Sequence, residues 1–169
     1  MARPTTLVSG GQTGVDRGAL RAALDCGLEV GGWCPPGREA EDGPIPPDLP
    51  LRETPVERSP DAPHVPRSLR TEWNVRDSDA TLVLRPAGSE GSDPGTDWAA
   101  RCAVRYGRPL VARDPEDLAA AAEVARWLDA LGVRRLNVAG PGEGTHPGIG
   151  ERAYDFIEAL LLHLPGRGS

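Results

Sequence analysis

Backbone amides are the first candidates for chemistry in this chain, because glycines cluster where an apolar run gives way to a helical pattern. The sharpest cluster is the turn Gly10-Gly11-Gln12-Thr13-Gly14. Glycine permits positive φ angles and a close approach of the backbone, and free amides at a helix start favour an anion. The Gly-x-Gly-x-x-Gly spacing of a dinucleotide fingerprint is absent. We expect this turn to bind a phosphate-bearing ligand; the alternative is a tight strand-to-helix turn without one.

Two other Gly-rich loops, Gly88–Gly95 and Gly140–Gly148, also follow expected strands. In open parallel sheets ligands bind beyond the carboxyl ends of the strands, so adjacent strands would bring all three loops to one edge. Gly95-Thr96 opens a helix and is a candidate second contact with the anion. Asp16 has three candidate roles: to cap the helix in a capping box with Thr13, to bond a sugar hydroxyl, or to hold an arginine.

All 19 basic residues are Arg, and the chain has no Lys. The absence of Lys excludes a Walker A phosphate lysine, a Schiff-base lysine and a kinase-type lysine. Cations that meet phosphate must therefore be arginines, whose planar fork suits this contact. The candidates are Arg38, Arg70 and Arg76. Trp33 could stack on a ring, although core packing is the alternative for it, and a solvated helix is the alternative for the polar stretch 70–79.

Recognisable catalytic sets are missing. There is no His-Glu-x-x-His, no Gly-x-Ser-x-Gly and no cluster of Cys and His. Cys34 could be a reactive thiol or a soft metal ligand, but a lone cysteine is more often inert, and the three cysteines are too scattered for a disulfide framework. Four residues could act as acids or bases, although their spacing singles out none: Asp42, Glu72, Asp77 and Asp79. We therefore assign no catalytic and no metal-binding residue.

Length and charge restrict the class of protein. A chain of 169 residues suits one domain, 1–169, with a sizeable core. The formal net charge of −6 argues against nucleic acid as a partner. No apolar run approaches the roughly 20 residues of a membrane span, and the N-terminus lacks the apolar region of a signal peptide. We expect a cytoplasmic protein with no membrane partner.

Hydrophobic periodicity predicts strands that alternate with helices. This alternation indicates βαβ units and a mostly parallel sheet. The expected strands are Thr5–Ser9, Leu28–Gly31, Ala80–Leu84, Pro109–Ala112 and Arg135–Ala139. The expected helices are Val15–Cys26, Thr71–Arg76, Gly95–Tyr106, one that starts at Asp114 and ends before Gly132, and a last one that follows the loop Gly140–Gly148 and runs to about Leu164.

Two segments give more specific expectations. Asp114-Pro115-Glu116-Asp117 has an N-cap residue, Pro at the first helical position and acids in the first turn, which predicts a helix start. The inward stripe of that helix would be Leu118, Ala121, Ala125, Leu128 and Leu131. The segment Trp33–Leu69 has many prolines and little periodicity, so we expect an excursion that lies across the domain.

Four blocks of sequence, in order along nearly the whole chain, resemble the molybdenum cofactor carrier-like family. They are 9–17, 31–43, 70–79 and 136–141, which read SGGQTGVDR, GGWCPPGREAEDG, RTEWNVRDSD and LNVAGP. The resemblance implies a Rossmann-like α/β fold: a three-layer, open, mostly parallel sheet with helices on both faces. It also implies a homo-oligomer, a dimer or tetramer, that holds molybdenum cofactor (molybdopterin, a phosphorylated pterin) and protects it or delivers it to molybdoenzymes.

The same resemblance extends to the wider group that includes the cytokinin-activating LOG phosphoribohydrolases. Their Pro-Gly-Gly-x-Gly-Thr loop is incomplete here, since Pro94-Gly95-Thr96 lacks a glycine, although Arg70 and Glu72 superficially mimic their catalytic pair. A carrier is therefore the leading hypothesis. The alternative is a nucleotide-binding enzyme or sensor, such as a LOG-like nucleoside-monophosphate phosphoribohydrolase with Glu72 or Asp79 as its acid. The candidate ligand-binding residues are Gly10, Gly11, Gln12, Thr13, Gly14, Asp16, Trp33, Arg38, Arg70, Asn74, Gly95 and Thr96.

Overall fold

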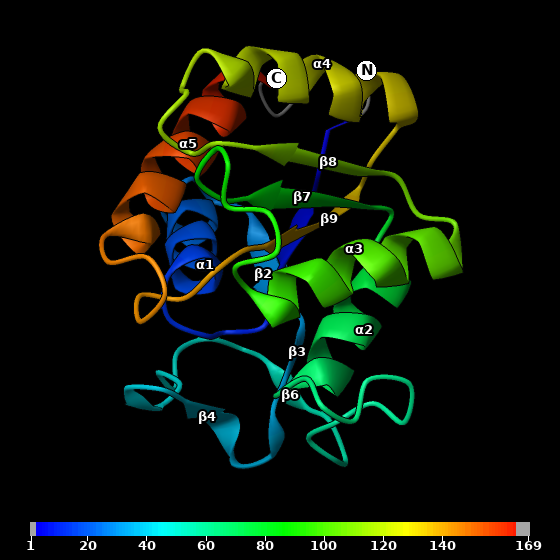
Figure 1. The fold of residues 1–169 in the computed structure, drawn as a ribbon. Helices are drawn as coiled ribbons and strands as arrows, with labels where there is room; N and C mark the ends of the chain where they lie inside the picture. Colours follow the sequence, from blue (N-terminus) through cyan, green and yellow to red (C-terminus); the bar gives the residue numbers. More distant parts are fainter. Residues whose placement is uncertain (1–2, 165–169) are drawn as a thin grey trace.

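Five strands form the central sheet of the computed structural model, which describes residues 3–164. Their order is β2-β1-β9-β7-β8, and every neighbouring pair is parallel. β9 comes last along the chain among them, yet it lies between β1 and β7 (Figure 1). The bounds are β1 (Thr6–Val8), β2 (Glu29–Gly31), β7 (Ala80–Leu84), β8 (Leu110–Arg113) and β9 (Arg135–Ala139).

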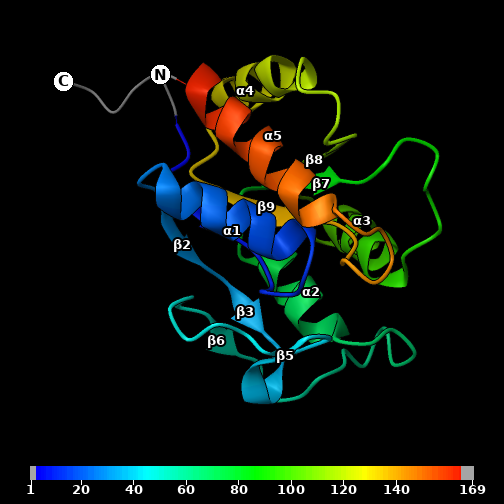
Figure 2. The same ribbon diagram turned by 90° about the vertical axis from the view of Figure 1, so that its left-hand side faces the viewer.

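Helices cover both faces of this sheet. Apolar side chains of α1, α4 and α5 share one core, whereas those of α2 and α3 form a second cluster. Figure 2 shows α1 and α5 in front of the strands and α3 behind them. The three-layer α/β arrangement is therefore confirmed. The bounds are α1 (Val15–Asp25), α2 (Ser68–Arg76), α3 (Pro94–Tyr106), α4 (Ala120–Leu131) and α5 (Ile149–His163).

Burial explains why these segments form these elements. All five residues of β7 are buried, as expected for a central strand that is covered on both faces. α1 and α5 pack closely because both carry a glycine at the contact: a Cβ on Gly18 would clash with the carbonyl oxygen of Gly150. Within residues 3–164, no helix has the length and apolar character needed to cross a membrane.

The excursion between β2 and α2 forms two small strand pairs beside α2 (Figure 1). It is anchored by three apolar side chains that are buried against the main core, Ile45, Leu49 and Leu51. β4 and β5 form a short antiparallel hairpin whose tip is Glu41–Asp42, and β3 and β6 are parallel. The bounds are β3 (Trp33–Cys34), η1 (Pro36–Arg38), β4 (Glu39–Ala40), β5 (Gly43–Pro44) and β6 (Arg52–Glu53).

The predicted helix start at Asp114 is wrong, because α4 begins at Ala120. The carboxylate of Asp114 accepts the backbone N–H of Glu116 at 2.9 Å and that of Ala87 at 3.0 Å. Asp114 therefore forms a turn that ties the loop after β7 to the end of β8, and the helix starts only after that turn. The predicted inward positions Leu118 and Leu131 are 47% and 48% exposed.

Candidate functional site

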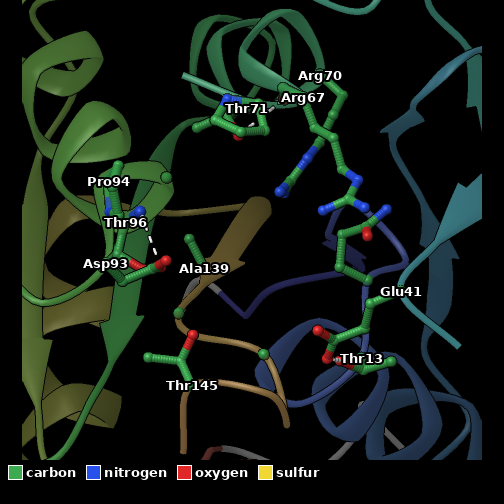
Figure 3. A pocket seen from close by; sticks show the side chains of 15 residues that line it. Thr13, Glu41, Arg67, Arg70, Thr71, Asp93, Pro94, Thr96, Ala139 and Thr145 are labelled. Carbon is green, nitrogen blue, oxygen red and sulfur yellow. Dashed lines mark hydrogen bonds between the residues drawn. The ribbon is translucent and has the colours of Figure 1, made fainter. Parts of the chain in front are cut away.

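A cavity of about 210 Å³ opens at the carboxyl edge of the sheet, where β1, β9 and β7 end (Figure 3). The three Gly-rich loops meet there, as the order of the strands requires. α2 and the hairpin tip of the excursion complete the wall. The lining residues are Gln12, Thr13, Glu41, Pro66, Arg67, Arg70, Thr71, Asp93, Pro94, Gly95, Thr96, Ala139, Gly140, Gly142 and Thr145.

Glycines in the first turn allow other groups to approach it closely. Gly14 has φ 80° and ψ −128°, a conformation that L side chains rarely adopt. A Cβ there would lie 2.5 Å from the carbonyl oxygen of Pro141 in the Gly140–Gly148 loop. A Cβ on Gly10 would lie 2.5 Å from Nη1 of Arg70. The turn is therefore shaped by contact with a loop on one side and with an arginine on the other.

Asp16 holds Arg70 over this turn. Its Oδ2 lies 3.3 Å from Arg70 Nη1 and accepts the backbone N–H of Gln12 at 3.1 Å. Burial raises the pKa of Asp16, and the charge of Arg70 opposes that shift. The predicted capping box is wrong, because α1 follows Gly14 without a side-chain cap. Of the three roles considered for Asp16, the structure shows the one in which it holds an arginine.

Arg70 keeps hydrogen-bonding capacity for another partner. Its side chain is 15% exposed, and Nε is buried with no hydrogen-bond partner in the described part of the chain. Buried donors without partners are rare because they are costly. Arg70 lines the cavity, and Figure 3 shows its side chain reaching down from α2.

Arg67 is a second arginine on the same wall, and no pattern in the sequence indicated it. It lies just before α2 with φ 55°, a left-handed conformation that is costly for a residue with a Cβ. Its guanidinium forms no ion pair with any residue in the range 3–164. Such strain is concentrated at functional sites, and here it accompanies a cation that faces the cavity (Figure 3).

Two carboxylates face the arginines. Asp93 accepts the backbone N–H of Thr96 at 3.1 Å and also its hydroxyl, so it already caps the start of α3. Glu41 accepts the hydroxyl of Thr13 and the backbone N–H of Gly144, the latter at 3.0 Å. The Thr96 donors, which were predicted to contact an anion, are thus already bonded to the Asp93 carboxylate. The cavity therefore combines two arginines with two acidic side chains.

Seven candidate ligand-binding residues do not line this cavity. Gly10, Gly11, Gly14 and Asp16 belong to the first turn and the start of α1, whereas Trp33, Arg38 and Asn74 each have a structural contact elsewhere. The Asn74 side chain accepts the backbone N–H of Trp33 at 2.7 Å and donates to its carbonyl at 3.0 Å. Trp33 donates its Nε1–H to Asp77 at 2.9 Å. Arg38 donates to three carbonyls of the excursion, those of Pro46, Leu49 and Leu51. The contacts of Trp33 with Asn74 and Asp77 hold the excursion against α2 and its end, whereas those of Arg38 brace the excursion internally. None of Trp33, Arg38 and Asn74 lines the cavity.

The candidate acids of the hydrolase hypothesis also lie elsewhere. Glu72 accepts the hydroxyls of Ser59 at 2.5 Å and Tyr106 at 2.7 Å. Asp79 accepts the backbone N–H groups of residues 134 and 135, at the amino ends of β7 and β9. Cys34 is fully buried, and burial raises the pKa of its thiol, which disfavours a reactive thiolate. In the described residues, no group of three or more acids, His or Cys could hold a metal ion.

Comparison with known proteins assigns the chain to a family. The model of the circularly permutated YpsA SLOG family matches residues 7–161. The chain belongs to this family. A crystal structure described as a "putative molybdenum carrier protein" from Syntrophus aciditrophicus SB is 34% identical, with a TM-score of 0.83. The match covers 95% of this chain and 96% of that one. No curated protein matches the chain. The resemblance identified from the four sequence blocks is thereby confirmed.

In this SLOG-family chain, the hydrogen bonds that the Glu41 carboxylate accepts should make the free energy of unfolding depend on pH. The hydrogen bond from the Thr13 hydroxyl, and to a lesser extent that from the Gly144 N–H, lowers the pKa of Glu41 below its usual 4.5. A lowered pKa stabilises the folded state above the unfolded-state pKa, and this contribution is lost as the pH falls through the folded-state pKa. In urea titrations at pH values that span this range, Glu41→Gln should lose less unfolding free energy with falling pH than the wild type. Equal slopes in the two proteins would contradict the contact.

Proposed function

We propose that the cavity at the carboxyl edge binds the phosphate group of a small molecule, with Arg70 and Arg67 as the cations. The observation that carries this proposal is the guanidinium of Arg70, which lines the cavity beside Asp16 and whose buried Nε has no partner in the described residues. Guanidinium groups bind phosphate through charge-assisted, often bidentate hydrogen bonds. A further donor would come from the hydroxyl of Thr145 in the lining, whereas that of Thr71 donates to the Arg67 carbonyl at 3.5 Å.

We propose molybdenum cofactor as that small molecule and storage or delivery as the function. The name of the structural neighbour and its 34% identity support this choice. The residues present fit the phosphate end of the cofactor, because two arginines face the cavity. The metal of the cofactor is bound by its own dithiolene, so the cavity needs no protein ligands for it. At about 210 Å³ the cavity is smaller than the roughly 300–1,000 Å³ of ligand pockets, so only part of the cofactor would fit.

Native mass spectrometry of gently purified protein tests this function. The expected spectrum contains an adduct with the mass of molybdenum cofactor, which is absent from an Arg70→Met variant prepared in the same way. The mass of the intact assembly in the same spectrum also tests the expected homo-oligomer, a dimer or tetramer. Protein that carries no adduct, and that molybdenum cofactor does not stabilise in a thermal shift assay, would count against the carrier function.

Nucleotide binding is the second candidate, and the polar lining of the cavity favours it. Glu41 and Asp93, with the threonine hydroxyls, could accept hydrogen bonds from the hydroxyls of a sugar phosphate. The contacts of Glu72 with Ser59 and Tyr106 give no support to a base-releasing enzyme that uses Glu72. Incubation with nucleoside monophosphates separates the possibilities: a bound, intact nucleotide indicates a sensor, and release of free base indicates a hydrolase.

A further inference from the structure

The carboxylate of Glu41 occupies donors that would suit an anionic ligand. It accepts the hydroxyl of Thr13 and the backbone N–H of Gly144, from two of the three Gly-rich loops. The backbone N–H of Glu143 donates to the Thr13 hydroxyl oxygen at 3.1 Å, which leaves the Thr13 hydrogen directed at Glu41. Hydroxyl and amide donors of this kind bind carboxylate and phosphate oxygens alike.

Glu41 sits on a segment that can be displaced at small cost. The hairpin tip Glu41–Asp42 is exposed, and the nearest buried apolar anchor along the chain is Ile45. The other side-chain contact of the tip is a bidentate ion pair of Asp42 with Arg17, at 2.5 and 2.8 Å, in which the Asp42 side chain is 49% and the Arg17 side chain 18% exposed. Solvent screens this pair on the Asp42 side, so it adds a polar contact to the tip but no apolar anchor. The tip is therefore held by polar contacts that an anion from solution can replace.

Arg67 provides a cation near the same donors. Its charge contributes to the lowered pKa of Glu41, although the two side chains form no ion pair. In Figure 3, Arg70 from α2 and Arg67 from just before it reach into the cavity, and Glu41 with Thr13 lies across from them. The cavity thus has hydrogen-bond donors on two opposite walls. On one of these walls, the donors Thr13 and Gly144 are already bonded to the Glu41 carboxylate.

We propose that the Thr13 hydroxyl and the Gly144 N–H form a second anion subsite, filled in this structure by the Glu41 carboxylate, and that a ligand with two anionic groups, such as a diphosphate, displaces Glu41 and takes it over. The proposal rests on the proposed function, in which Arg70 and Arg67 bind the first anionic group. It adds a specificity: a ligand with one phosphate leaves Glu41 in place, whereas a ligand with two must move it.

Displacement of the tip would also enlarge the site. A more open hollow of about 480 Å³ lies on the other side of Thr13 and is lined in part by Asp42, Arg17 and Glu143. Thr13 lines both hollows, and the tip contributes Glu41 to one and Asp42 to the other. When the tip moves away, the two hollows join. This accounts for how a cavity smaller than a typical ligand pocket could admit a larger ligand.

Calorimetric titration at neutral pH with inorganic phosphate and with pyrophosphate tests the subsite. Glu41→Gln should bind pyrophosphate about tenfold more tightly than the wild type does, because a like charge and a competing acceptor are both weakened. Inorganic phosphate should gain less than about threefold, since it needs only the arginine wall. The matched control is Glu53→Gln, which weakens a carboxylate–amide contact in the same excursion, with Gly37, and should change neither affinity.

A second variant separates a true subsite from a general effect of charge. Thr13→Val in the Glu41→Gln background removes the hydroxyl donor while it preserves the shape, so it should abolish the gain for pyrophosphate. If the gain persists in this double variant, or if Glu41→Gln shows no gain while inorganic phosphate still binds through Arg70, the second subsite is overturned and the proposed function stands. If neither probe binds the wild type or Glu41→Gln, both are overturned.

Discussion

Arg70→Met should lower the affinity for inorganic phosphate and for pyrophosphate about a hundredfold. A hydrogen bond to a charged group contributes about 1.5–3 kcal/mol, and loss of two such bonds at the lower value corresponds to about a hundredfold in the dissociation constant. The guanidinium is well placed for both, because it lines the cavity and Asp16 holds it there, with Oδ2 at 3.3 Å from Nη1. Calorimetric titration of the two probes measures the loss directly.

Two further variants show whether this loss comes from the ligand contact or from the fold. Arg70→Met leaves Asp16 buried without its cation, and we expect it to lower stability as well, since a buried charge without a partner is costly. Arg70→Met combined with Asp16→Asn should restore most of that stability but none of the affinity. Arg105→Met, which breaks an exposed ion pair with Asp61, is the surface control and should leave affinity unchanged. Recovery of binding in the double variant would exclude Arg70 as the phosphate ligand.

The sheet and its carboxyl edge were predictable because buried strands need apolar runs and the helices between them need a helical repeat of apolar residues. Ala80–Leu84 is apolar enough for a strand that is buried on both faces, and the observed bounds of β7 are identical. The convergence of the Gly-rich loops followed because the carboxyl ends of parallel strands lie at one edge of the sheet. It held only on the condition that β1, β9 and β7 are neighbours. Strand order itself was not predictable, because it depends on contacts between segments more than a hundred residues apart.

The failures occurred where a local signal competed with a distant partner. Asp114 and Pro115 look like a helix start, but the Asp114 carboxylate is engaged by Ala87 from the loop after β7. Glu41 and Arg67 lie in a segment without periodicity, so no pattern placed them at the cavity. The path of that segment depends on buried anchors such as Ile45 and on the three carbonyls that Arg38 binds. Such contacts become visible only once the chain is folded.

Gly14→Ala should lower the free energy of unfolding by about 3 kcal/mol or more, since backbone strain and overpacking of this kind each cost about 1–3 kcal/mol. The new Cβ would meet backbone on the Gly140–Gly148 loop, with the carbonyl oxygen of Pro141 at 2.5 Å and Cα of Gly142 at 2.7 Å. Backbone cannot rotate away as a side chain can. For a chain of this length the loss corresponds to a fall in Tm of about 10 °C, which thermal or urea unfolding would measure.

Gly107→Ala separates the cost of the backbone conformation from the cost of the contact. Gly107 has φ 64° and ends α3, but a Cβ there would meet nothing within 4 Å. Its substitution should cost only about 1–2 kcal/mol, the penalty of a left-handed residue. The excess loss in Gly14→Ala then measures how tightly the first turn is packed on the Gly140–Gly148 loop. Equal losses would show that the loop yields easily, and the wall that carries the Thr13 and Gly144 donors would then not be rigid enough to form a defined anion subsite.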